Sequence, residues 1–221
     1  MILRSQIVDQ NHMPINPAAL EGHVYLVDDN EDIRHHLTLL LKRYGLTVDA
    51  FNSAEMLLKL SAINEHAVIL LDMSLPGVSG VKAFEALRNK GCKTPVVFIS
   101  GQSEPVEIID AMKLGATDFL WKPFTTNDLL AAIKKALATA RIQGELSSIY
   151  QSKLNLWNAM TVREKEICSL MMNGCGNTEI GERLNVQPDT IKKHRARIME
   201  KFGTSTLSQL VDIFRGFNPA D

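Results

Sequence analysis

The chain has 221 residues, enough for one large domain or two small ones. Hydrophobic residues make up 45% of it and charged residues 22%, which excludes a disordered or collagen-like protein. The longest buried-looking apolar stretch, Ala67–Leu71, is far shorter than a membrane span, and the N-terminus lacks the apolar segment of a secretory signal. Three cysteines without metal-site spacing favour a reducing compartment, so we expect a cytoplasmic protein with no membrane partner.

The formal charge of −1 conceals a difference between the two parts of the chain. Residues 1–140 hold 13 Lys and Arg against 16 Asp and Glu, whereas residues 141–221 hold 11 against 9. Basic side chains concentrate in residues 192–201, at Lys192, Lys193, Arg195, Arg197 and Lys201. An acidic front and a locally basic back indicate two functions rather than one.

The first part of the chain predicts an α/β domain. Residues 1–20 are polar and are expected to form a mostly unstructured extension. From 21 to 140, apolar strands alternate with helices of 3.6-residue period. The predicted strands are 23–27, 47–51, 68–71, 96–100 and 119–121, and the predicted helices are 31–44, 54–60, 81–89, 105–114 and 126–141. This alternation predicts a doubly wound, five-stranded parallel sheet covered by helices on both faces.

The second part of the chain predicts only helices. Residues 141–155 are polar and aperiodic, so we expect a linker or a frayed extension of the preceding helix. In residues 156–221 a capping box, Thr161–Glu164, opens a helix that reaches residue 173, and Asn177 is expected to cap a second that ends at residue 184. A third helix covers 188–202, and a fourth runs from Ser205 or Thr206 to residue 214. Four short helices with tight turns indicate a helix-turn-helix domain.

Chemically active side chains follow the predicted strands. Asp28 and Asp29 come after the first strand and Asp72 after the third, at the edge where parallel sheets place their functional crevice. Two carboxylates about 4 Å apart repel by about 4 kcal/mol at an effective dielectric near 20, so this cluster requires a cation or a proton. Oxygen ligands of this kind suit Mg²⁺. Ser100 and Lys122 follow two further strands and supply a hydroxyl and an ammonium.

Each of these residues also has an ordinary interpretation. Adjacent aspartates after a strand usually form a solvated turn, a lone aspartate there often caps a helix, and Ser100 and Lys122 would usually be a turn residue and a surface lysine. Four strand ends with complementary groups make that interpretation much weaker. A carboxylate nucleophile, a metal, a hydroxyl and a lysine together can accept a phosphoryl group.

These motifs resemble the receiver domain of bacterial two-component response regulators, which has a flavodoxin-like fold. The resemblance spans about residues 21–140 and rests on four segments in order, 24–30, 71–80, 97–101 and 115–124. It implies that Asp72 is the phospho-acceptor. It also implies that Asp29, Asp72 and the backbone carbonyl of Ser74 bind Mg²⁺, with Asp28 acting largely through water.

The resemblance also implies a switch. Ser100 would bond the phosphoryl group, Lys122 would pair with it, and the Phe119 rotamer would follow Ser100. The added charge of about −1.5 to −2 would then reshape the surface formed by residues 108–114, 119 and 126–133. In this family that surface commonly forms a homodimer, and a sensor histidine kinase supplies the phosphoryl group.

The third predicted helix of the second part has two different sides. Ile191, Ile198 and Phe202 fall on one stripe, which we expect to be buried. Lys192, Lys193, Ala196 and Glu200 fall on the opposite side, with His194, Arg195, Arg197 and Lys201 beside them. Such a helix fits the major groove of DNA, although a basic run on a helix is usually only a solvated face.

The surrounding residues resemble the LuxR-type DNA-binding domain over about 156–215. The resemblance rests on segments 161–164, 177–180 and 190–198 and on the pairs 202–203 and 210–211. Receiver and LuxR-type domain together form the NarL/FixJ architecture of transcription factors. The resemblance implies that Lys192, Lys193 and Ala196 face bases, while Thr190, His194 and Lys201 contact the DNA backbone; Arg197 flanks this face and is also expected to contact DNA.

The leading hypothesis is therefore a phosphorylation-controlled transcription factor, not an enzyme, that binds promoter DNA as a dimer and contacts RNA polymerase. A Mg²⁺-dependent phosphatase with an aspartate nucleophile is an alternative, but residues 72–74 lack the second acid of the usual Asp-x-Asp signature. A phosphate-independent regulator that uses the first domain only for dimerisation is another. The intact set of Asp28, Asp29, Asp72, Ser100 and Lys122 argues against it.

Overall fold

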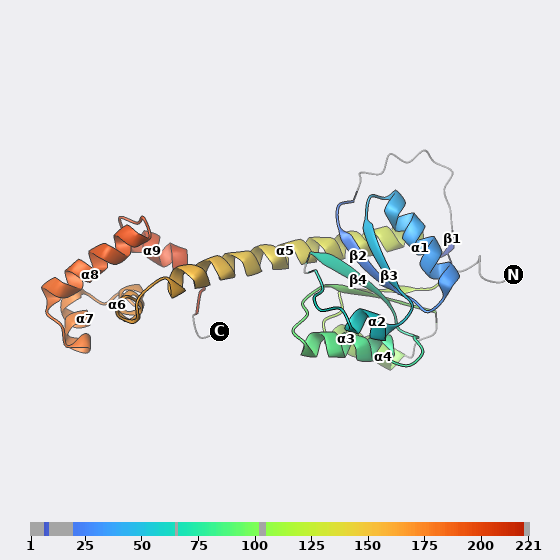
Figure 1. Cartoon of the computed structure of the whole chain (residues 1–221), viewed down its shortest axis with the longest axis horizontal. Helices are drawn as coiled ribbons and strands as arrows, with labels where there is room; N and C mark the ends of the chain where they lie inside the picture. Colours follow the sequence, from blue (N-terminus) through green and yellow to red (C-terminus); the bar gives the residue numbers. More distant parts are fainter. Residues whose placement is uncertain (1–6, 9–19, 65, 102–104, 219–221) are drawn as a thin grey trace. The chain divides into compact units, whose positions relative to one another are not determined.

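A computed structural model of the chain describes residues 7–8, 20–64, 66–101 and 105–218 (Figure 1). The chain divides into two compact units, Met1–Glu145 and Leu146–Asp221. The boundary lies inside the segment 141–155 that the sequence predicted as a linker. Among the described residues, no helix combines the length and the apolar character that crossing a membrane requires.

The first unit contains the predicted parallel sheet. Its five strands are hydrogen-bonded in the order β3-β2-β4-β5-β6, and every neighbouring pair is parallel. The strands are β2 (His23–Val27), β3 (Thr47–Phe51), β4 (Ala67–Asp72), β5 (Val96–Ser100) and β6 (Asp118–Trp121). Because β2 and β4 are neighbours, the ends of the first and third predicted strands meet at the same edge of the sheet. The fold class predicted from the sequence is confirmed, and the predicted strands 23–27, 47–51 and 96–100 match β2, β3 and β5. The predicted strand 68–71 is one residue shorter than β4 at each end, and the predicted strand 119–121 begins one residue later than β6.

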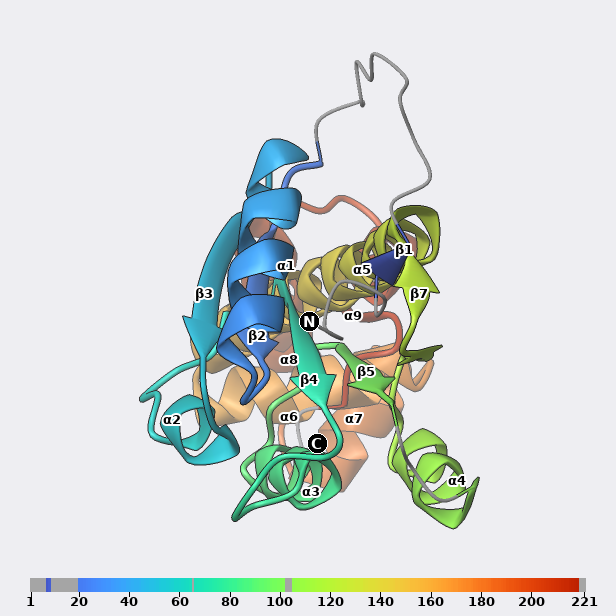
Figure 2. The ribbon, with the colours of Figure 1, turned by 90° about the vertical axis from the view of Figure 1, so that its right-hand side faces the viewer.

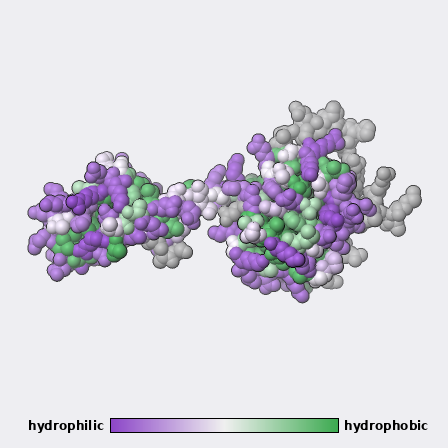
Figure 3. Space-filling model, viewed as in Figure 1, coloured by the Kyte–Doolittle hydropathy of each residue, from purple (hydrophilic) through white to green (hydrophobic). Residues whose placement is uncertain are grey.

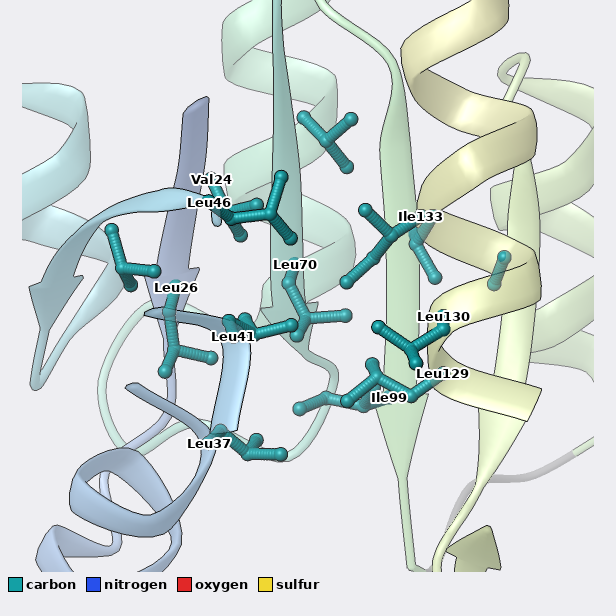
Figure 4. Packing of buried hydrophobic residues seen from close by; sticks show 14 of the residues in the cluster. Val24, Leu26, Leu37, Leu41, Leu46, Leu70, Ile99, Leu129, Leu130 and Ile133 are labelled. Carbon is teal, nitrogen blue, oxygen red and sulfur yellow. The ribbon is translucent and has the colours of Figure 1, made fainter. Parts of the chain in front are cut away.

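Helices cover both faces of this sheet (Figure 2). One face packs against α1 (Glu31–Arg43) and the first half of α5 (Thr126–Asn158), and Figure 4 shows the aliphatic side chains that meet there. The other face packs against α2 (Ala54–Leu58), α3 (Gly80–Asn89) and α4 (Pro105–Lys113). All residues of β4 and β5 are buried, as expected for central strands that are apolar on both sides.

Local signals set where the helices begin. The Asn30 side chain accepts a hydrogen bond from the Ile33 backbone at 3.1 Å and caps α1, and Ser79 caps α3. Gly80 begins α3 directly against the end of β4, where a Cβ atom would lie 2.2 Å from the carbonyl oxygen of Asp72. A larger residue at Gly80 would therefore push the helix away from the strand end that carries Asp72.

The ends of the first unit add detail to the sequence expectations. The predicted helix 126–141 continues as α5 to Asn158, so of the two alternatives expected for residues 141–155, the extension of the preceding helix is the one found. Their polar, aperiodic sequence reflects a largely exposed helix with little core to face. Within the predicted extension 1–20, the pair β1 (Ile7–Val8) lies parallel to β7 (Phe124–Thr125). Residues 1–6 and 9–19 of that extension lie outside the described residues.

The second unit is helical, as predicted. After the end of α5 it contains α6 (Val162–Met172), α7 (Asn177–Leu184), α8 (Pro188–Lys201) and α9 (Leu207–Phe214). Thr161 and Glu164 form the predicted capping box, and Thr206 forms a second one with Gln209. The predicted cap Asn177 is wrong by one residue: Gly176 occupies the N-cap position and Asn177 begins the helix. Hydrophilic side chains cover much of this unit's surface in the view of Figure 3.

Candidate functional site

Three carboxylates converge at one edge of the sheet. Asp28 follows β2, Asp72 is the last residue of β4, and one oxygen from each of Asp28, Asp29 and Asp72 lies within 4.8 Å of the other two. Asp28 is 0% exposed and Asp72 is 5% exposed, whereas Asp29 faces solvent. The predicted convergence of these side chains is confirmed.

One lysine lies between the two buried carboxylates. The Nζ atom of Lys122 is 2.7 Å from Oδ2 of Asp28 and 2.6 Å from Oδ2 of Asp72. Lys122 directly follows β6, its backbone N–H donates to the carbonyl of Ser100 at 2.7 Å, and its peptide bond to Pro123 is cis. One ammonium against three carboxylates leaves an excess of negative charge at the site.

Burial and pairing act against each other on these groups. Burial raises the pKa of the Asp28 carboxyl above its ordinary value, and the hydrogen bond and charge of Lys122 only partly offset this. For Lys122, burial alone would lower the pKa of the ammonium, but the charges and hydrogen bonds of Asp72 and Asp28 outweigh it and raise that pKa. The lysine therefore stays protonated at neutral pH.

Main-chain hydrogen bonds orient the carboxylates. Oδ1 of Asp28 accepts from the Asn30 backbone N–H at 2.9 Å, and Oδ1 of Asp72 accepts from the Ser74 N–H at 2.8 Å. The guanidinium of Arg34 donates to the carbonyl oxygens of Asp28 at 2.8 Å and Asp29 at 3.1 Å. The carboxylates of Asp28 and Asp72 are thus each held in place by the turn that follows their own strand.

Two supporting residues were not predicted from the sequence. Arg34 holds the turn after β2, and Glu55 of α2 accepts from the Val78 N–H at 3.1 Å, which fixes the loop after β4. Backbone donors, its own N–H and that of Val78, hold the pKa of Glu55 below its usual value. Both residues act on backbone groups, and a single charged residue on a helix gives no sequence signal for such a contact.

The predicted switch residues lie on the two strands at the β6 edge of the sheet. Ser100 ends β5 and is 0% exposed. Phe119 of β6 lies opposite Phe98 of β5 and packs, half-buried, beside the core formed with α2, α3 and α4. Its ring meets that of Trp121 edge-on, with centroids 5.0 Å apart. Trp121 itself is 50% exposed.

In the second unit, α8 has the two sides that its sequence predicted. Ile191 and Ile198 are fully buried in the core, and Phe202 packs partly buried beside them. The side chains at positions 190, 192, 193, 196 and 197 are exposed, and His194 is half-buried. Helix α8 therefore presents Thr190, Lys192, Lys193, Ala196 and Arg197 to solvent.

Two basic side chains of α8 contact the protein itself. Arg195 donates to the carbonyl of Cys175 at 3.2 Å, in the turn between α6 and α7. Lys201 donates to the carbonyl of Ala159 at 2.7 Å and pairs with Glu164 at 3.0 Å. The wheel predicted that these residues flank the exposed face, and it gave no sign of these intramolecular partners.

Comparison with known families identifies both units. Residues 24–134 match the response regulator receiver domain, and residues 158–214 match the bacterial regulatory proteins of the luxR family. The chain belongs to the response regulators. It is a transcription factor with a receiver and a LuxR-type DNA-binding domain, not an enzyme, so the phosphatase alternative is not retained. The receiver implies a kinase partner, and the LuxR-type domain implies DNA binding.

Similar regulators cover nearly the whole chain. The transcriptional regulatory protein TdiR of Thauera aromatica is 34% identical over 87% of this chain and 86% of its own length. The transcriptional regulatory protein FixJ of Azorhizobium caulinodans is 30% identical over 93% of this chain and 97% of its own. Among solved structures, the response regulator StyR superposes with a TM-score of 0.79 at 31% identity, over 90% of this chain and 100% of StyR. The NarL/FixJ-type resemblance is confirmed.

Proposed function

We propose that Asp72 accepts a phosphoryl group from a sensor histidine kinase and that this charge controls binding to promoter DNA. The observation that carries the proposal is the position of Asp72: it ends the central strand β4, is almost fully buried, and has the Lys122 ammonium 2.6 Å from Oδ2. Asp28 and Asp29 lie beside it but follow a different strand. As a transcription factor, the protein would act in the cytoplasm, where the promoter is.

The transfer requires a nucleophile and a stabilised phosphoryl group. A carboxylate oxygen of Asp72 attacks phosphorus while the P–N bond to the kinase imidazole breaks, and the imidazole nitrogen retains that electron pair and takes a proton from solvent. Lys122 places positive charge beside the new acyl phosphate, and the Ser100 hydroxyl donates to a phosphoryl oxygen. The raised pKa of Lys122 favours this role because it keeps the ammonium charged.

The residues of the site fit a divalent cation. Asp29, Asp72 and the carbonyl of Ser74 would hold Mg²⁺, with Asp28 acting through water, because hard oxygen donors and excess negative charge are what this ion requires. When bound, the ion supplies positive charge to the phosphoryl oxygens. Arg34 and Glu55 keep the two ligand-bearing turns in place through the backbone contacts described above.

Phosphorylation would then change the surface around Phe119 and, through a dimer, the placement of α8 on DNA. Ser100 moving toward the phosphoryl group would let Phe119 turn inward, and the nearby exposed apolar residues Ile109, Met112 and Trp121 would support a homodimer. A dimer would place two copies of α8 on two half-sites of a promoter, with RNA polymerase nearby. The residues proposed to contact DNA are Thr190, Lys192, Lys193, His194, Ala196 and Arg197. Lys201, which the resemblance also assigned to the DNA backbone, is left out of this set because its ammonium bonds to Ala159 and Glu164 within the protein.

Phosphoryl labelling tests the proposal directly. The wild-type chain, incubated with a small-molecule phosphodonor and Mg²⁺, should gain one phosphoryl group by intact mass, and Asp72→Asn should gain none. Asp49→Asn is the matched control, since Asp49 is an aspartate on β3 whose side chain is 54% exposed, and it should be labelled normally. Persistent labelling of Asp72→Asn would assign the acceptor to another residue.

A further inference from the structure

Lys201 is the last residue of α8, and its ammonium is bound to other groups of the second unit. Its Nζ atom lies 2.7 Å from the carbonyl oxygen of Ala159 and 3.0 Å from Oε2 of Glu164. Lys201 is exposed, as Lys192, Lys193 and Arg197 are, with 35% of its side-chain surface accessible, so burial does not set it apart. What sets it apart from these three residues is that its ammonium bonds to a carbonyl and a carboxylate of the protein itself.

The Ala159 carbonyl is one of the groups that a helix end leaves without a partner. Helix α5 ends at Asn158, and the last backbone bonds of this end run from Ala159 N–H to Asn155 and from Met160 N–H to Trp157. The final carbonyls of a helix carry partial negative charge and favour a nearby cation. Lys201 supplies that cation from a helix 42 positions further along the chain.

The Glu164 carboxylate connects this contact to a third helix. Oε2 of Glu164 accepts from the Thr161 N–H at 2.9 Å, which is one half of the capping box that begins α6, and the same oxygen pairs with Lys201. Lys201 thus joins three places in the second unit: the end of α5, the start of α6 and the end of α8. Arg195 fixes the middle of α8 in the same manner, through the carbonyl of Cys175.

We propose that Lys201 is a positioning residue that sets the direction of α8, and that it does not bind a DNA phosphate. This rests on the proposed role of α8 in DNA binding and divides its basic side chains into two groups. Lys192, Lys193 and Arg197 face the nucleic acid, whereas Arg195 and Lys201 hold the helix on the α5–α6 junction. Loss of Lys201 would leave the exposed basic residues in place and change the angle at which they are presented.

The test compares Lys201→Met with Lys193→Met, a matched control on the same helix that faces solvent. Binding of each full-length variant is measured against salt with two probes: a random-sequence 30-base-pair duplex, and a duplex selected in vitro with the wild-type chain. Removing one lysine–phosphate interaction lowers the log–log salt slope by about 0.9. All measurements are made well below the melting temperature of the variants, so that weaker binding does not report unfolding.

We expect Lys201→Met to keep the wild-type salt slope on the random duplex but to bind the selected duplex about tenfold more weakly, as one charge-assisted hydrogen bond predicts. Lys193→Met should lower the slope, because an ammonium that lies against DNA displaces counterions whether it faces a base or a phosphate. Lys201→Arg, which keeps a cation and its donors, should restore binding to the selected duplex. A slope for Lys201→Met as low as that of Lys193→Met, or unchanged affinity for the selected duplex, overturns the proposal.

A second measurement needs no DNA. Hydrogen exchange of the amides in residues 159–164 should be faster in Lys201→Met than in the wild type, because the helix end and the capping box lose a shared partner. Unchanged exchange there overturns the proposal even if no DNA sequence is ever selected. Failure of the wild-type chain to bind any duplex would instead contradict the proposed function, so the two failures are distinguishable.

Discussion

The two units treat charge in opposite ways. The first unit buries two carboxylates at the ends of parallel strands and pairs both with Lys122, whereas the second displays lysine and arginine on the exposed side of one helix. A buried charge requires a partner, so the buried positions of Asp72 and Lys122 strongly restrict the groups with which each can interact. An exposed charge has no such requirement, and its place on a helix leaves its partner undetermined.

Removing the buried lysine should have the largest effect and tests whether burial gives a charge its importance. Lys122→Met leaves Asp28 and Asp72 without their ammonium and should lower the free energy of unfolding by about 3–5 kcal/mol, measured with urea in the presence of a chelator. Added Mg²⁺ should stabilise the variant more than the wild type, because the carboxylates then lack any other cation.

An exposed lysine in the same unit is the control for that experiment. Lys135 pairs with Asp118 at 2.9 Å, but its side chain is 61% exposed, so Lys135→Met should change the free energy of unfolding by less than about 1 kcal/mol. Equal losses for the two variants would show that burial does not distinguish the lysines of this unit.

The second prediction concerns the exposed basic face. Lys193→Ala should weaken binding to an in-vitro selected duplex by about 1–3 kcal/mol at fixed salt, because the proposal places this side chain against a base. Fluorescence anisotropy with labelled duplex measures this. Arg141→Ala, which removes a 78% exposed cation from α5, should leave the affinity unchanged. Equal effects of the two substitutions would indicate that only net charge matters, and α8 would then lose its special role.

The same contrast explains what the sequence could predict. The sheet and its carboxylates were predictable because apolar strands alternate with helices and because parallel strands end at one edge, so Asp28, Asp29 and Asp72 had to meet. The helical wheel correctly separated Ile191 and Ile198 from the exposed side of α8. The wheel gives an angle around one helix and contains no information about what neighbouring helices offer.

The interactions that the sequence did not predict share a physical cause. Arg34, Glu55 and Lys201 all bind backbone groups of other segments, and every segment has such groups whatever its sequence. The helical extension of α5 over 141–158 was also uncertain from sequence, since an exposed helix needs no apolar period. Hydrogen bonds between a side chain and the main chain of another segment are therefore the part of both sites that only the fold reveals.

The smallest expected effect is a dependence of stability on pH in the second unit. The Thr161 backbone N–H and then the Lys201 ammonium hold the pKa of Glu164 below its ordinary value of 4.5. The folded state therefore favours the charged form of Glu164, so the stabilisation from this charge is present at neutral pH and is lost as the pH falls through the lowered pKa.

Glu164→Gln should lower the free energy of unfolding by about 0.5 kcal/mol at pH 7. Urea unfolding should show this difference shrinking as the pH is lowered from 7 toward the acid range below 4.5. Glu182→Gln, at an exposed site on α7, is the control and should show no such convergence. A Glu164→Gln difference that stays constant as the pH is lowered would mean that altered packing, not the missing charge, is responsible.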